Sequence, residues 1–219
     1  MKREVKKPTG LTGLTWLSFE TASADFRRLQ FPSAKDEVET LVAQDFIAAA
    51  NQQSILNYSV TSYEKNPTDD YDFTLDTSAG RRYLELLEVA PESLMKSGYQ
   101  EAPGTYRTKE LAQALLGSIE SKSRKYDSVT AAHTLLLLYE TQWTFAGDEV
   151  ALLSLQHGTY RMAPKFEEIY WYHPISPGDG IIEFVYPTPS DYWQTFDPEC
   201  YREIVTTALD PAGWTMERK

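Results

Sequence analysis

A chain of 219 residues, 42% of them hydrophobic, is long enough to bury one substantial core or at most two small ones. Its 32 acidic and 21 basic side chains give a formal charge of −11, which repels phosphate polyanions at long range and disfavours a general nucleic-acid binder. With 14 Tyr and 5 Trp, the composition also excludes a disordered polymer.

The cysteine content and the N-terminal residues indicate in which cellular compartment the protein is expected. Cys200 is the only cysteine, which excludes an intramolecular disulfide and a cysteine-rich zinc site and indicates a reducing, cytoplasmic environment. The basic start MKREVKKPTG is not followed by a long apolar run, so we expect neither a signal peptide nor a membrane span. We expect residues 1–32 to form an N-terminal extension and residues 33–219 a single α/β domain.

The first half of the chain predicts helices followed by strands. A short helix is expected around residues 22–29, and Pro32 then breaks the chain. Residues 33–53 place apolar side chains at helical spacing, with Ser33 as the expected cap. Three strands are then predicted from residues that favour extended structure, at 55–63, 71–76 and 81–90. The last two of these strands flank the turn TSAG and predict a hairpin.

The second half alternates helices and strands. A second helix is predicted over residues 108–126, after a long loop. The apolar run HTLLLLYET, residues 133–141, predicts a central strand that is buried on both faces. The remaining elements are a helix at 147–157, strands at 167–174 and 180–187, and a closing helix at 197–209. This order predicts a mixed β-sheet flanked by helices in one domain.

Acidic residues in the predicted hairpin form the candidate site. Asp72 stands near the start of the first strand, with Asp70 as the alternative register, and Glu85 lies inside the second strand. Carboxylate oxygens are the ligands that Mg²⁺ prefers, and hydrolysis of a phosphodiester needs an activated water and a neutralised charge. The same acids also suit a turn and a solvated strand face, so both interpretations stay open at this point.

This element order, together with these acids, resembles the PD-(D/E)XK nuclease superfamily, which has the restriction-endonuclease-like fold. The similarity covers about residues 33–140 and depends on short motifs and on element order. It implies a Mg²⁺-dependent nuclease with Asp72 and Glu85 as metal ligands, and a further acid from the preceding helix, either Glu37 or Glu39.

Leu87 stands where the family pattern has a lysine. A lysine from elsewhere would have to replace it, and the candidates are Lys122 and Lys125 on the second long helix and Lys96 in the loop before it. Lys122 follows the apolar stripe of its helix, so we expect it to face the sheet. Basic residues near a helix C-terminus are also favoured by the helix dipole alone, so their position does not by itself indicate catalysis.

Other enzyme classes lack support in the sequence. His133, His157 and His173 stand singly without metal-site spacing, and neither a glycine-rich phosphate loop nor a nucleophile elbow is present. Large aromatic side chains over residues 169–174 indicate core packing. The acidic residues around this aromatic cluster would suit a protein partner better than DNA.

Two functions are therefore expected. The first is a Mg²⁺-dependent nuclease-like protein with a degenerate motif, whose nucleic-acid substrate the net charge disfavours. The alternative is a non-catalytic acidic protein-interaction module on the same fold. The sequence does not indicate an oligomeric state.

Overall fold

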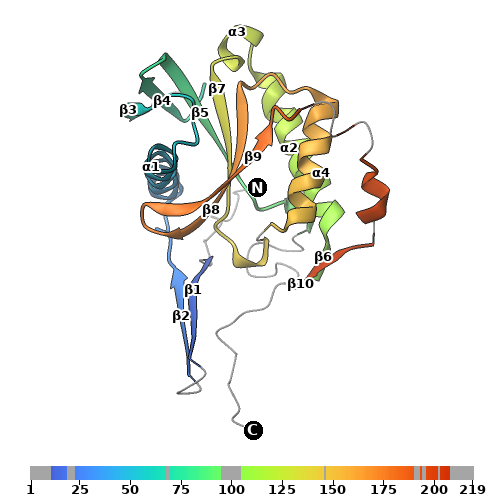
Figure 1. The fold of residues 1–219 in the computed structure, drawn as a ribbon. Coiled ribbons are helices and arrows are strands. Elements are labelled where there is room, and N and C mark those ends of the chain that lie inside the picture. The colour runs from blue at the N-terminus through green and yellow to red at the C-terminus, as the bar shows by residue number, and fades with distance from the viewer. Residues whose placement is uncertain are drawn as a thin grey trace, which may run out of the picture.

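The computed structural model describes residues 11–18, 23–67, 70–94, 105–145, 147–189, 193, 196–201 and 203–207. A six-stranded sheet forms the centre of the mixed α/β arrangement (Figure 1). In spatial order its strands are β3 (Val60–Lys65), β4 (Phe73–Thr77), β5 (Gly80–Glu88), β7 (Thr134–Tyr139), β8 (Glu168–Ser176) and β9 (Asp179–Tyr186).

The sheet is parallel in its middle and antiparallel at both sides. Strand β7 pairs in parallel with β5 and with β8, whereas the β3–β4, β4–β5 and β8–β9 pairs are antiparallel. All residues of β7 are buried, which confirms the expected central strand. Its continuous run of leucines follows from this position, because both faces of a central parallel strand are covered by helices.

Helices cover both faces of the sheet (Figure 1). Helix α1 (Lys35–Gln53) packs on one face, where Phe46, Leu84 and Tyr172 belong to one buried core. Helices α2 (Thr108–Lys125) and α4 (Glu149–Met162) pack on the other face, where Leu115, Leu136 and Trp171 belong to a second core. The mixed sheet flanked by helices is therefore as predicted.

Smaller elements surround this framework. Strands β1 (Leu11–Ser18) and β2 (Ser23–Leu29) form an antiparallel hairpin that contacts β8. The short strands β6 (Thr105–Arg107) and β10 (Val205–Thr207) pair with each other. The remaining short helices are η1 (Glu92–Leu94), α3 (Ser128–Ala131), η3 (Trp143–Phe145) and η4 (Pro198–Tyr201).

Three local predictions were wrong. Over residues 23–29 the expected helix is instead strand β2, because pairing with β1 supplies stable hydrogen bonds, whereas so short a helix is marginal in isolation. The expected closing helix is replaced by η4 and by β10, whose β-branched run Val-Thr-Thr pairs with β6. Helix α1 begins one residue later than expected, so its N-cap is Ala34 and Ser33 does not cap it.

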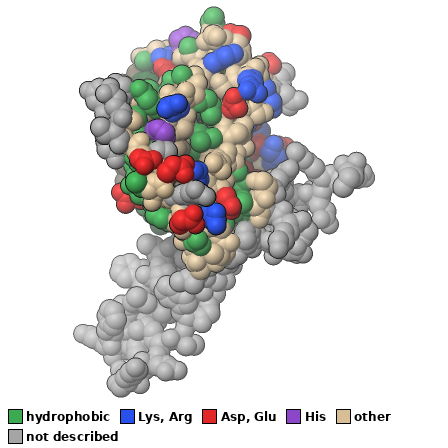
Figure 2. All heavy atoms as spheres, turned by 90° about the vertical axis from the view of Figure 1, so that its right-hand side faces the viewer, with side chains coloured by type: hydrophobic (Ala, Val, Ile, Leu, Met, Phe, Trp, Pro, Cys, Tyr) green, Lys and Arg blue, Asp and Glu red, His purple; other side chains and the backbone are tan. Residues whose placement is uncertain are grey.

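Figure 2 shows the side of the molecule that carries α4 and η4 in Figure 1. Acidic and basic side chains are interspersed on it, and a group of acidic side chains lies close to a histidine and to hydrophobic side chains.

Over the part of the chain that the structure describes, no helix combines the length and the apolar character needed to cross a bilayer.

Candidate functional site

A cavity of about 750 Å³ brings together the acids and lysines that the sequence singled out. Asp72, Glu85, Lys122 and Lys125 all line it. The other lining residues come from α1, the end of β3 and the loop that follows: Lys35, Asp36, Glu39, Lys65, Asn66 and Pro67. Segments far apart in the sequence therefore meet at one hollow beside the hairpin.

The hairpin register places the two central acids together. Phe73 of β4 pairs with Leu84 of β5, so Asp72 and Glu85 follow at neighbouring positions of the two strands. Asp72 Oδ2 accepts a hydrogen bond from the backbone N–H of Leu86 at 2.7 Å, which fixes its carboxylate against β5. Asp70, the alternative register, is exposed in the preceding turn.

Glu85 is buried and is paired with a lysine from α2. Strand alternation turns Glu85 and Leu87 toward the face that α2 covers, and the Lys122 Nζ donates a hydrogen bond to Glu85 Oε1. Leu87 packs against the second core instead of lining the cavity. Lys125 is exposed at the cavity. Lys96 lies outside the described residues.

Helix α1 adds a second buried carboxylate to the cavity. Glu39 is only 5% exposed and pairs with Lys35 at 3.1 Å and with Lys65 at 3.2 Å, whereas Glu37 is exposed. Of the two helix acids considered from the sequence, only Glu39 reaches the cavity. Sequence reasoning missed Lys35 and Lys65, although the spacing of Lys35 and Glu39, one helical turn apart, is a signal that could have found the first.

Burial and like charge act together on the central acids. Burial, and then the charge of Glu85, raise the pKa of Asp72 to about 6, against the lowering effects of the Leu86 N–H and of Lys122. Burial also raises the pKa of the Tyr126 phenol, and the adjacent charge of Glu85 raises it further. Tyr126, at the end of α2, is a second neighbour that the sequence did not indicate.

A Mg²⁺ ion fits these carboxylates as a two-ligand site. The described residues contain no group of three or more His, Cys, Asp or Glu side chains arranged to hold a metal. Mg²⁺ commonly takes only one or two protein carboxylates and completes its shell with water and phosphate oxygens. One oxygen of Asp72 accepts from the Leu86 N–H, which leaves its second oxygen for a hard cation. Glu85 already interacts with Lys122 and with the Tyr126 hydroxyl, so a cation would share this carboxylate with them.

Comparison with known proteins gives little further information. No family model matches the sequence, and no curated protein matches it. Among solved structures, the chain is similar to SfsA of Pyrococcus furiosus in complex with Ca²⁺, at 11% sequence identity and a TM-score of 0.31. The match covers 78% of this chain and 75% of that one. A score of this size does not establish a shared fold, so the interpretation of the site depends on its own geometry.

Proposed function

We propose that this cavity is the active site of a Mg²⁺-dependent phosphodiester hydrolase of the PD-(D/E)XK type. The observation that carries the proposal is the ion pair of Lys122 and Glu85 in a cavity that Asp72 also lines. In this proposal, α2 supplies the ammonium group that Leu87 cannot supply from β5.

The proposed roles follow from the chemistry of each group. Asp72 and Glu85 would hold the ion, which when bound polarises a phosphoryl oxygen and lowers the pKa of a coordinated water. With its pKa raised to about 6, Asp72 is mostly ionised at neutral pH and can serve as a ligand. The Lys122 ammonium would stabilise the negative charge that develops on the phosphate.

The charge of the cavity supports a phosphate substrate. Four lysines and four carboxylates line it, so its side chains are balanced although the whole chain carries −11. A bound divalent cation would make this hollow locally positive. Lys125 is exposed and lines the cavity, and in this proposal it would contact a phosphate that approaches from solvent. The cavity itself therefore does not add to the long-range repulsion expected from the net charge.

A non-catalytic role on the same framework is the second candidate. It is favoured by the fact that Lys122 already neutralises Glu85, and by the lack of a three-ligand metal group in the described residues. In that case the ion pairs of the cavity would be structural, and the acidic surface would bind a protein partner.

The test combines metal binding with cleavage. Mg²⁺ and Mn²⁺ binding is measured by calorimetry on wild type, Glu85→Gln and Lys122→Met, and single- and double-stranded DNA and RNA are incubated with each protein and metal. We expect metal-dependent cleavage by wild type, loss of metal binding in Glu85→Gln, and loss of cleavage with metal binding retained in Lys122→Met.

Lys109→Met is the matched control, because Lys109 lies on the same helix in an ion pair with Glu199 that is far more exposed. It should cleave like wild type. If wild type neither binds metal nor cleaves any substrate, while circular dichroism shows a folded protein, the hydrolase proposal fails and the structural alternative is favoured.

A further inference from the structure

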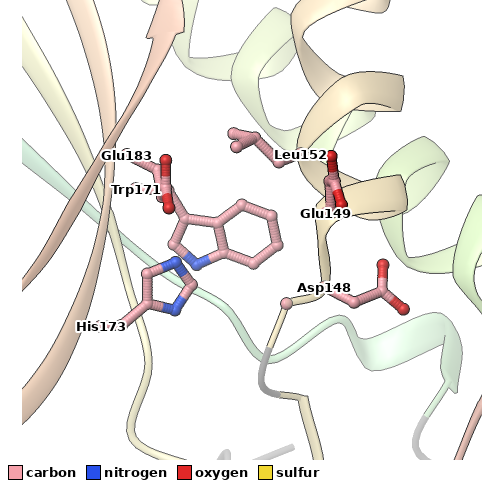
Figure 3. A pocket seen from close by; sticks show the side chains of 7 residues that line it. Asp148, Glu149, Leu152, Trp171, His173 and Glu183 are labelled. Atoms are coloured by element: carbon pink, nitrogen blue, oxygen red, sulfur yellow. The ribbon is translucent and has the colours of Figure 1, made fainter.

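A second cavity, of about 380 Å³, lies between the start of α4 and strands β8 and β9 (Figure 3). Its described lining residues do not overlap with those of the cavity around Glu85. Trp171 and Leu152 supply apolar walls, and His173, Glu149 and Glu183 supply polar groups. The hydrolase proposal uses none of these residues, so this site must be explained separately.

The indole of Trp171 contributes a donor that has no acceptor. The side chain is fully buried, yet its Nε1 has no hydrogen-bond partner within the described part of the chain. In Figure 3 the indole stands in the middle of the lining residues, with its nitrogen on the edge nearest His173. A buried N–H without an acceptor is destabilising and rare in folded proteins, so such a group at a cavity wall indicates a ligand that accepts from it.

Neighbouring contacts hold this indole in place. His173 stacks on it at 5.2 Å between ring centroids, and its Nδ1 lies 3.0 Å from the buried Oε1 of Glu140. Glu140 Oε1 also accepts a hydrogen bond from the N–H of Gly147 at 2.9 Å. A Cβ on Gly147 would lie 2.2 Å from an indole carbon, so the loop packs closely on the ring. The donor is therefore fixed before any ligand binds.

Two carboxylates face the cavity, and one of them, Glu183, lies close enough to His173 to help raise the pKa of its imidazole. Figure 3 shows Glu149, from α4, and Glu183, from β9, on opposite sides of Trp171. Neither carboxylate makes a hydrogen bond or ion pair with any other residue that the structure describes. Asp148 differs, because its oxygens already accept from the N–H of Ala151 and from the hydroxyl of Thr206. The two glutamates thus offer negative charge on both sides of an aromatic ring.

This combination selects an organic cation over a metal ion. The described residues contain no group of three or more His, Cys, Asp or Glu side chains that could hold a metal here, and the indole between the two glutamates offers a metal ion no ligand atom. An ammonium or guanidinium group can contact an indole face and carboxylates together, because the ring quadrupole attracts cations. We propose that the cavity binds a small organic cation, of the primary ammonium or guanidinium class, that also carries a hydrogen-bond acceptor such as a carbonyl. The cation lies between Glu149 and Glu183, and the acceptor receives the Trp171 N–H.

Three small probes separate the two parts of the proposal. Glycinamide carries both an ammonium and a carbonyl, ethylammonium carries only the cation, and acetamide carries only the acceptor. Binding is followed by calorimetry and by the indole N–H signals of ¹⁵N-labelled protein, with Trp171 assigned through Trp171→Phe. We expect glycinamide to shift the Trp171 signal, and each of the other two probes to bind about tenfold more weakly or worse.

Charge-neutral variants test the carboxylates. Glu149→Gln and Glu183→Gln should each weaken glycinamide binding by about tenfold, because each removes a charge-assisted contact. Glu64→Gln is the control, since this exposed acid on β3 lies at the other edge of the sheet and carries the same charge. Both cavity glutamates lie outside the buried core, so these variants should fold even if Trp171→Phe does not.

The proposal is overturned if glycinamide leaves all indole signals unmoved and gives no heat of binding. It is also overturned if acetamide binds as well as glycinamide, or if the two Gln variants bind like Glu64→Gln. These outcomes are independent of nuclease activity, because none of the measurements uses a metal or a nucleic acid.

Discussion

The carboxylate of Glu85 on β5 accepts a hydrogen bond from the ammonium of Lys122 on α2, 37 residues further along the chain. The two side chains are 8% and 19% exposed. A charge with so little access to water depends on its partner, because burial removes most of its hydration. The pair therefore joins α2 to the sheet through electrostatics as well as through packing.

Removing the lysine should destabilise the fold. In Lys122→Met the carboxylate of Glu85 is left buried and unpaired, and we expect the free energy of unfolding at pH 7 to fall by about 2 to 4 kcal/mol. Urea unfolding followed by circular dichroism measures it. Lys109→Met, on the same helix, removes a more exposed pair and should cost less than about 1 kcal/mol. The double variant Glu85→Gln/Lys122→Met should recover most of the loss, and a double variant as unstable as Lys122→Met would contradict this account.

Asp72 should make the protein less stable as the pH rises. Its pKa is raised from 3.8 to about 6 in the folded state. The contribution of the protonated side chain to the free energy of unfolding is therefore complete below about pH 4 and is lost as the pH rises through 6. Asp72→Asn keeps a neutral side chain at every pH. We expect the free energy of unfolding of Asp72→Asn, relative to that of wild type, to rise by up to about 3 kcal/mol between pH 4 and pH 8. The measurement is urea unfolding of both proteins across this range, and a constant difference would show that Asp72 does not titrate in this window.

The same titration should control metal binding, if the hydrolase proposal holds. A protonated Asp72 cannot serve as a carboxylate ligand, so Mg²⁺ affinity should increase as the pH rises from 5 to 7. Calorimetry in buffers of different ionisation enthalpy should also detect a proton released on binding at pH 5.5. Equal affinity at both pH values, with no proton release, would remove Asp72 from the ligand set.

Much of the framework could be predicted from local sequence. The uninterrupted leucine run of β7 and the turn between β4 and β5 are local signals, and their elements lie where expected. The wrong predictions of helices concern segments whose structure depends on pairing with another strand. Residues 23–29 and 205–207 form strands because β1 and β6 pair with them, and no local pattern shows those partners.

Some residues of the candidate site could also be predicted from spacing, whereas others come together only through tertiary packing. Hairpin register brings Asp72 next to Glu85, and the helical stripe of α2 turns Lys122 toward the sheet, so these three could be selected from spacing. Lys65 meets Glu39 only because α1 packs beside the end of β3, which spacing does not show. The unpaired indole N–H of Trp171 is likewise a tertiary property, because the sequence indicates burial but not a missing acceptor.

His173 should stabilise the protein most at acidic pH. Burial opposes protonation of its imidazole, but the charge and hydrogen bond of Glu140, aided by Glu183, raise its pKa above 6.5. The stabilisation is therefore complete below about pH 6.5 and is lost as the pH rises through the folded-state pKa. The difference in free energy of unfolding between wild type and His173→Gln should be larger at pH 6 than at pH 8.5. A difference that grows with pH would show that the interaction with Glu140 does not favour the protonated form of His173.

Two glycines should respond in opposite ways to alanine. In Gly147→Ala the new Cβ would lie 2.2 Å from an indole carbon of Trp171, and neither the fully buried ring nor the backbone that donates to Glu140 can move freely. We expect the free energy of unfolding to fall by about 1 to 3 kcal/mol, as for other overpacked cores. Gly117→Ala, on α2, meets nothing within 4 Å and should gain up to about 1 kcal/mol from helix propensity.

Thermal and urea unfolding of both variants provide the comparison. Because Gly147 also holds the indole at the second cavity, Gly147→Ala should weaken glycinamide binding, whereas Gly117→Ala should not. If Gly147→Ala is as stable as wild type and still binds glycinamide normally, the loop can move away from the ring. The indole N–H would then not be fixed in advance, and its lack of an acceptor would no longer point to a ligand.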